Sequence, residues 1–266
     1  MENEIVKVEQ YEILPSTKGN ENFDVQIATA KRYPRELMRV VDNAIAIVVR
    51  DEKTASTCSY SLPKGGKQIK GPSVHLARII AQLYGNLRME VYASNITATT
   101  VSATAVAFDL ESNYAVKIEA VRKILDKYGK RYNEDMVNTT MQAAMAVAER
   151  NAIFKIIPKS IIDQIYEAAQ RKLTGDLSTE EKLIAKRKEV ISFFKKTYDV
   201  EEKEILKLYG KQTFSQITAE DIASLRGFVQ ALKDGDTTID DTFDRVSKVD
   251  KNKNKLLLDD TETTNI

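Results

Sequence analysis

The sequence has few of the residues on which covalent or metal chemistry usually depends, with one cysteine, Cys58, and one histidine, His75. A lone cysteine cannot form an internal disulfide, and it fits a reducing cytoplasm. Zinc sites are usually built from several cysteine and histidine ligands, so we expect no metal site of this kind. Because no second histidine could activate Cys58, we expect a packed side chain there and not a nucleophile.

Long apolar runs are also missing. No run approaches the roughly 20 residues that a membrane-spanning helix needs. The opening residues, Met1 to Glu4, include two glutamates and do not resemble a secretory signal. We therefore expect a cytoplasmic protein without membrane association. A chain of 266 residues suits one medium globular core with extensions.

An excess of charge of one sign is also lacking, because basic and acidic residues nearly balance over the whole chain. The two kinds of residue are unevenly distributed along it. Residues 23–172 hold 22 lysines and arginines against 15 acidic residues, a net charge of +7. The remainder holds 18 against 24, a net charge of −6, which accounts for the overall +1. A basic body with acidic extensions favours a polyanionic partner, although a solvated surface of scattered charge gives the same pattern.

Composition divides the chain into four parts. Residues 1–22 are polar and acidic and are expected to form a flexible arm. Residues 23–175 hold the periodic apolar segments of a core, and residues 176–244 hold enough apolar positions for a small helical unit. Residues 245–266 have the composition of a disordered tail.

The first part of the core is predicted to contain two helices. Apolar spacing after Tyr33 indicates a helix with Pro34 in its first position. Residues 56–71 are rich in glycine and proline and predict turns. A second helix follows, capped by Ser73 and ended by Gly85 in the left-handed conformation.

The second part of the core is predicted to contain a β-meander and two more helices. Alternating or β-branched segments at Met89–Ala93, Thr99–Phe108 and Tyr114–Ala120 predict three antiparallel strands. A long alanine-rich helix follows from about Glu134 to Phe154, and another from Ser160 to Leu173. The predicted fold class is α+β, an antiparallel meander flanked by helices with a small helical C-terminal unit.

This order of elements resembles the shared core of the single-strand DNA annealing superfamily, which includes Red-beta, RecT, Erf and the eukaryotic Rad annealing proteins, and in particular phage proteins of this type. The resemblance is carried by DVQIATAKRYPRE (24–36), KGPSVHLARIIAQLYGNL (70–87) and MVNTTMQAAMAVAERNAIFKIIPKSI (136–161). Tyr84-Gly85 matches the aromatic-glycine end of the family's helix before the meander. Arg150 and Lys155 match basic positions of the helix after it.

The resemblance implies binding and annealing of single-stranded DNA in phage homologous recombination, without ATP, covalent chemistry or an obligate cofactor. It also implies self-association into rings or helical filaments in the cytoplasm of a bacterial host. The C-terminal helical unit resembles the accessory region of the family, which contacts a host single-strand binding protein or a phage exonuclease.

Three basic clusters could bind the phosphates, and nearby rings could stack on bases. The predicted phosphate contacts are Arg32, Arg35, Lys67, Lys70, Lys123, Lys127, Lys130, Arg131 and Arg150, and the predicted stacking residues are Tyr128 and Tyr132. A solvated surface is the alternative interpretation of each cluster, and a structural ion pair is the alternative for Arg150.

Two other functions fit parts of the sequence. Asp109, Glu111 and Glu119 could gather Mg²⁺ in a nuclease, but Val121 stands where the common nuclease signature has lysine. A phage assembly or scaffolding protein would also contain alanine- and methionine-rich helices. An ATPase is disfavoured, because Pro72 occupies the position of the lysine in a phosphate loop.

Overall fold

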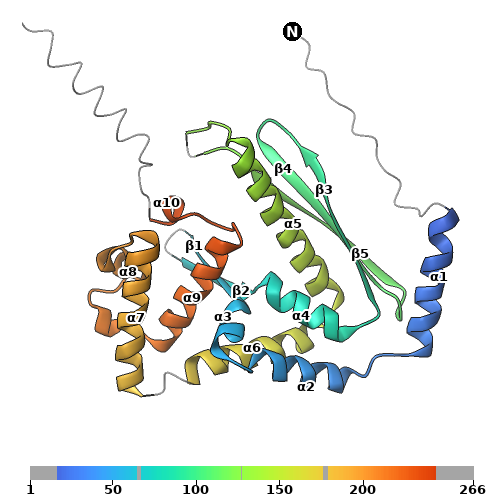
Figure 1. Ribbon diagram of the computed structural model, residues 1–266, viewed down its shortest axis with the longest axis horizontal. Helices are drawn as coiled ribbons and strands as arrows, with labels where there is room; N and C mark the ends of the chain where they lie inside the picture. The colour runs from blue at the N-terminus through green and yellow to red at the C-terminus, as the bar shows by residue number, and fades with distance from the viewer. Residues whose placement is uncertain (1–16, 65–66, 127, 176–178, 244–266) are drawn as a thin grey trace, which may run out of the picture. The chain divides into compact units, whose positions relative to one another are not determined.

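The computed structural model describes residues 17–64, 67–126, 128–175 and 179–243, and it divides into two compact units (Figure 1). Unit 1 comprises the residues up to Cys58 together with Pro72–Gln170. Unit 2 comprises Ser59–Gly71 together with the residues from Arg171 onward. The chain therefore leaves unit 1 after Cys58 and returns to it at Pro72, a division that the sequence did not indicate.

Unit 1 begins with helix α1 (Thr17–Arg32), so residues 17–22 of the segment that was expected to form a flexible arm are helical. Residues 1–16 lie outside the described residues. The ring of Phe23 stacks on the ring of Phe108, with centroids 5.2 Å apart, and the Arg88 guanidinium lies 5.2 Å from the Phe23 centroid. These contacts tie α1 to the sheet, which the polar composition of the segment did not suggest.

Three helices follow before the sheet. They are α2 (Leu37–Val48), α3 (Glu52–Thr57) and α4 (Val74–Tyr84). Helix α2 starts three residues after Pro34, a correction to the prediction. Ser73 caps α4 as predicted, because its hydroxyl accepts a hydrogen bond from the Leu76 amide at 3.2 Å. Gly85 ends α4 with φ 67° and ψ 171°, a positive φ outside the left-handed helical region.

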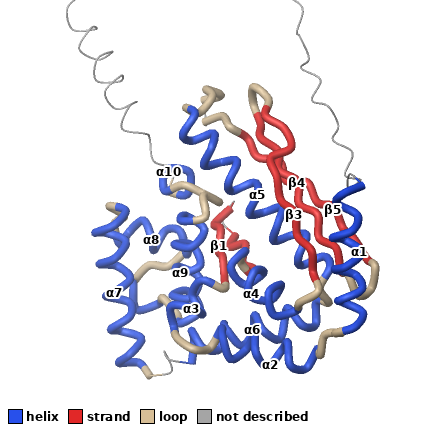
Figure 2. The backbone as a smooth tube through the Cα atoms, turned by 45° about the vertical axis from the view of Figure 1, so that its right-hand side comes forward, coloured by secondary structure: helices blue, strands red, loops and turns tan. Residues whose placement is uncertain are grey.

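The predicted meander is confirmed. Strands β3 (Leu87–Ile96), β4 (Thr100–Asp109) and β5 (Tyr114–Lys123) form an antiparallel sheet in the order β3-β4-β5. Helix α5 (Glu134–Ile156) lies along one face of this sheet (Figure 2). Alanines pack across that interface, including Ala105 of β4 and Ala148 of α5, both with no exposed surface. Short side chains allow the helix to approach the strands closely.

Helix α6 (Lys159–Gly175) continues the chain, close to its predicted range. Its apolar face joins the core of unit 1 through Ile161, Ile165 and Ala169. No helix in the described part of the chain is long and apolar enough to cross a membrane.

Unit 2 contains the helices α7 (Glu180–Tyr198), α8 (Glu202–Tyr209), α9 (Ala219–Lys233) and α10 (Ile239–Thr242), and a short 3₁₀ turn at Phe214–Gln216. Its core is built around the stacked rings of Phe194 and Phe228, with centroids 6.1 Å apart. The helical C-terminal region predicted from the sequence is thus present, and the predicted tail at 245–266 lies outside the described residues.

The segment predicted as turns forms a second, two-stranded sheet in unit 2, with β1 (Ser59–Lys64) paired to β2 (Lys67–Pro72). It packs on α9, where the Ser61 and Ser224 hydroxyls share a hydrogen bond of 2.8 Å. The Tyr209 hydroxyl donates to the Ser224 oxygen at 3.1 Å, and burial raises the pKa of Tyr209. Turn-forming residues at 56–71 therefore mark a hairpin that belongs with the C-terminal helices.

Candidate nucleic-acid interface

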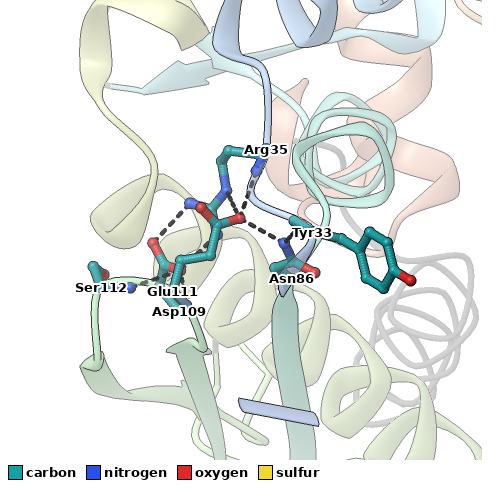
Figure 3. A network of polar contacts seen from close by, with 6 residues as sticks. All are labelled: Tyr33, Arg35, Asn86, Asp109, Glu111 and Ser112. Carbon is teal, nitrogen blue, oxygen red and sulfur yellow. Dashed lines mark hydrogen bonds and ion pairs between the residues drawn. The ribbon is translucent and has the colours of Figure 1, made fainter. Parts of the chain in front are cut away.

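Arg35, one of the predicted phosphate contacts, lies at the centre of a polar network in unit 1 (Figure 3). Its guanidinium donates to both carboxylate oxygens of Asp109, at 2.7 and 2.5 Å, and forms an ion pair of 3.0 Å with Glu111. Its backbone amide donates to Glu111 at 2.9 Å. The guanidinium carbon lies 3.8 Å from the centroid of the Tyr84 ring, a close cation–π contact.

Asn86 completes the network by donating to the Glu111 carboxylate at 2.5 Å and to the Tyr33 carbonyl at 2.9 Å. Burial opposes ionisation of Asp109, but hydrogen bonds from Arg35 and the Glu111 amide outweigh it and hold the pKa of Asp109 below 3.8. Likewise, the pKa of Arg35 is raised by Asp109 and Tyr84 although burial opposes it. The pair therefore stabilises the fold above pH 3.8, and this stabilisation is lost as the pH falls through the lowered pKa.

This geometry does not favour the predicted contact of Arg35 with phosphate. The side chains of Arg35 and Asp109 are only 8% and 7% exposed, and the guanidinium is bound on several sides. This ion pair connects the segment before α2 to the end of β4.

Of the three predicted magnesium ligands of the nuclease alternative, two are bound to an arginine and the third lies on the other face of the sheet. Asp109 and Glu111 are bound to Arg35. Glu119 pairs in register with Thr104, an odd number of residues from Asp109 along β4, so the two acidic side chains lie on opposite faces of the sheet. Within the described ranges, no group of three histidine, cysteine or acidic residues is placed to hold a metal ion.

The sheet face opposite α5, here called the outer face, carries cations and an exposed ring. Alternation of the three paired strands places the following side chains on it: Arg88, Glu90, Tyr92, Ser102, Thr104, Val106, Phe108, Ala115, Lys117, Glu119, Val121 and Lys123. Tyr92 is 37% exposed and Val121 59% exposed. Lys117 and Lys123 are exposed as well. The face is mixed in charge, since Glu90 pairs with Arg88 at 2.7 Å.

A turn follows β5 at the Lys123 end of the sheet. The Asp126 carboxylate accepts hydrogen bonds from the amides of Tyr128 and Lys130, both at 2.9 Å. The Ile124 amide donates to the Thr99 carbonyl at 2.9 Å, which fixes the turn to the strand end. Tyr128 is 63% exposed, and Lys130 is exposed beside it. The described residues of the turn therefore present a ring and a cation beside the strand end.

The other predicted residues of this cluster have different environments. Arg131 forms an ion pair of 2.7 Å with Glu134 and stays partly exposed. Tyr132 packs against the core of unit 1, so it is less available for stacking than Tyr128. Lys127 lies outside the described residues.

Two predicted arginines lie elsewhere in unit 1. Arg32 is exposed at the end of α1, with its guanidinium 5.6 Å from the Tyr33 centroid. Arg150 is half-buried on α5 and donates to the Asn151 amide oxygen at 3.3 Å. Its neighbour Glu149 is bound to Arg78 by two hydrogen bonds, at 3.0 and 2.6 Å.

Lys67 and Lys70 belong to unit 2, because both lie on β2. The other predicted phosphate contacts belong to unit 1. Lys70 is exposed. The resemblance to a phosphate loop also disappears, since a phosphate loop is irregular backbone before a helix and Lys67–Pro72 is a strand.

Sequence reasoning missed three residues of the candidate interface: Tyr92, Lys117 and Asp126. The first two lie in predicted strands, and the alternation of those strands could have placed them on one face. Asp126 could have been found from the spacing Asp-x-x-Gly, because aspartate before glycine commonly organises a turn.

Comparison with protein-family models, with curated proteins and with solved structures finds no match to this chain. The chemistry of the candidate interface must therefore be argued from its own residues.

Proposed function

We propose that this protein binds single-stranded DNA without ATP and promotes the annealing of complementary strands. The observation that carries the proposal is the outer face of unit 1, where exposed Tyr92, Lys117 and Lys123 continue into the turn that holds Tyr128 and Lys130. Single strands are commonly bound by cations that follow the backbone and by rings on which bases stack.

The proposed mechanism requires no bond to be made or broken in the DNA. Lysines neutralise phosphates and release counterions, which lowers the repulsion between two approaching strands. Tyr128 and Tyr92 offer stacking surfaces that accept any base. A strand bound along the face would be held extended with its bases available to a complement.

Other parts of the proposal concern partners. We infer that the protein also associates with itself, and that unit 2 contacts a protein of phage or host DNA metabolism, such as a single-strand binding protein or an exonuclease. Support for these partners comes from the resemblance of the element order to annealing proteins. The setting that follows is phage recombination in a bacterial cytoplasm.

The first experiment measures the annealing of two complementary labelled oligonucleotides by the full chain with no nucleotide present. Annealing should accelerate, and binding to one labelled strand should weaken steeply as salt rises. Binding that is independent of salt would contradict the proposed phosphate contacts.

A charge-reversal variant tests the interface itself. The double variant Lys123→Glu/Lys130→Glu should bind single strands roughly tenfold or more weakly and lose about two units of salt slope. The matched control is Lys53→Glu/Lys188→Glu, which changes two exposed lysines outside the clusters by the same charge. Equal losses in both variants would remove the outer face from the proposal.

A scaffolding role is the second candidate, favoured by exposed apolar side chains on β5 such as Tyr114 and Val121. It predicts self-association without salt-sensitive DNA binding, so the same titration separates the two functions. Cleavage of the strands on addition of Mg²⁺ would contradict both.

A further inference from the structure

Strand β5 forms a free edge of the three-stranded sheet. Within the described part of the chain it pairs with β4 alone, over ten consecutive residues without a bulge. The opposite edge, β3, is interrupted between Ala93 and Asn95, and its Arg88 packs on Phe23 of α1. Proteins usually protect edge strands by charged side chains, bulges, prolines or covering segments. Strand β5 carries charged residues, including Lys117 and Lys123, but it has neither a bulge nor a proline.

Strand β5 also carries apolar side chains between its charged residues. Tyr114 and Val121 are 53% and 59% exposed, and Val116 and Ile118 are only partly covered by the core of unit 1. A regular edge of this length that mixes charged and apolar residues can accept another strand whose charges complement its own.

The residues of β5 are complementary to themselves in one antiparallel register. If Ile118 lies opposite the partner's Ile118 across a two-fold axis, Lys117 lies opposite the partner's Glu119, and the same pair occurs twice. In that register Val116 also faces the partner's Ala120, so apolar residues meet on the side of α5. Opposite charges directly across a strand pair stabilise it.

Neighbouring registers lack this complementarity. A shift by two residues in one direction places Lys117 opposite the partner's Lys117, and a shift in the other direction places Glu119 opposite the partner's Glu119. Both place like charges directly across the pair, which is destabilising. A shift by one residue would bring side chains of opposite sheet faces together.

We propose that a second copy of this chain pairs with the edge of β5 about a two-fold axis through Ile118, joining two three-stranded sheets into one of six strands. The inference deepens the self-association included in the proposed function, on which it rests, but it uses no DNA contact. Because a two-fold contact closes on itself, this edge alone gives a dimer, and any larger ring or filament needs a further contact.

Charge-reversal variants test the pairing. Analytical ultracentrifugation of the full chain without DNA measures whether each variant is a monomer or a dimer. Glu119→Lys places a lysine opposite Lys117 of the other copy in both of the symmetric pairs. It should therefore weaken dimerisation by roughly tenfold. The double variant Lys117→Glu/Glu119→Lys exchanges the charges and should restore the dimer. A wild type that is monomeric throughout, or a double variant no better than the single one, would overturn the proposal.

A cysteine pair tests the register. Ile118→Cys places two thiols opposite each other about 4.5–5.5 Å apart between α-carbons, within reach of a disulfide. Val121→Cys is the matched control, because its two copies would be six residues out of register, about 20 Å apart. The native Cys58 is buried and should not compete.

Under mild oxidation, Ile118→Cys should form a covalent dimer while the more exposed Val121→Cys stays monomeric. Cross-linking of Val121→Cys as fast as Ile118→Cys would indicate random collision and overturn the register. The DNA titration distinguishes this failure from failure of the proposed function, since Glu119→Lys adds positive charge and should still bind single strands.

Discussion

Single residues of unit 1 bring together segments that are far apart in the chain. Arg35 connects the start of α2 to Asp109 at the end of β4, and Asn86 connects the end of α4 to the Tyr33 carbonyl. The network satisfies several buried polar groups at once. Removal of one member leaves the others without compensation in a water-poor environment, which costs more than the loss of one hydrogen bond.

Arg35→Ala should therefore lower the free energy of unfolding by about 3 kcal/mol or more, because it leaves Asp109 buried without its partner. Urea denaturation followed by circular dichroism measures the loss. Arg39→Ala, at an exposed site on α2, is the control and should change stability by less than about 0.5 kcal/mol. Unchanged stability with weakened DNA binding in Arg35→Ala would return Arg35 to the phosphate contacts.

The burial of Cys58 leads to a prediction for the free energy of unfolding at alkaline pH. Burial raises the pKa of its thiol from 9.0 to about 12, because the thiolate is poorly solvated in the core. The unfolded chain therefore loses this proton first, so the contribution to stability is constant below pH 9 and declines as pH rises from 9 toward 12. Unfolding free energies measured over this range should fall more steeply for wild type than for Cys58→Ala. Parallel pH dependences for the two proteins would contradict the raised pKa of Cys58.

At the scale of elements, unit 2 depends on close packing between the hairpin β1–β2 and helix α9. Gly227 is buried inside α9, and a β-carbon built there would lie 3.1 Å from the Ser61 amide nitrogen and the Tyr60 carbonyl carbon. Glycine in a helix usually costs about 1 kcal/mol relative to alanine. Its presence here is explained by the space that the hairpin backbone occupies.

Gly227→Ala should consequently destabilise unit 2 by about 1–3 kcal/mol, since overpacking outweighs the gain in helix propensity. Thermal unfolding of the full chain measures this, and hydrogen exchange at β1 locates it. Gly175→Ala is the control, because nothing lies within 4 Å of a β-carbon built at the end of α6. A midpoint raised by both substitutions would show that the hairpin does not press on α9.

At the scale of the whole molecule, the chain folds into units that are not continuous in sequence. The Ser73 amide donates to the Cys58 carbonyl at 3.0 Å, and the Ser73 hydroxyl donates to the Thr57 carbonyl at 2.5 Å. The two points where the hairpin segment leaves and re-enters unit 1 are therefore adjacent. Unit 1 can be closed there by a very short connection.

A fragment of residues 1–175 should gain stability and solubility when residues 59–71 are replaced by a short glycine linker. In the unmodified fragment the hairpin loses its contacts with α9 and exposes apolar surface and unpaired polar groups. Light scattering compares the solubility of the two fragments, and thermal unfolding compares their stability. If the unmodified fragment behaves as well as the closed one, the hairpin does not depend on unit 2.

The sequence by itself determined the elements whose causes are local. Apolar periodicity, the Ser73 cap and the alternation of residues 87–123 predicted α4, the meander and α5 in the right order, because these signals depend on neighbours within a turn or a strand. The basic clusters were visible too, as was the helical C-terminal region. Their composition does not depend on the fold.

Only the tertiary structure decided which of these residues share an environment. The sequence predicts that Arg35 is a surface cation. In the structure, the ion pair with Asp109, 74 residues away, holds its side chain in a buried position. The sequence predicts turns at residues 59–71. In the structure they form a two-stranded sheet that packs on α9 in unit 2. Partners so distant in the chain leave no periodic signal, since burial and pairing depend on contacts that exist only after the chain has folded.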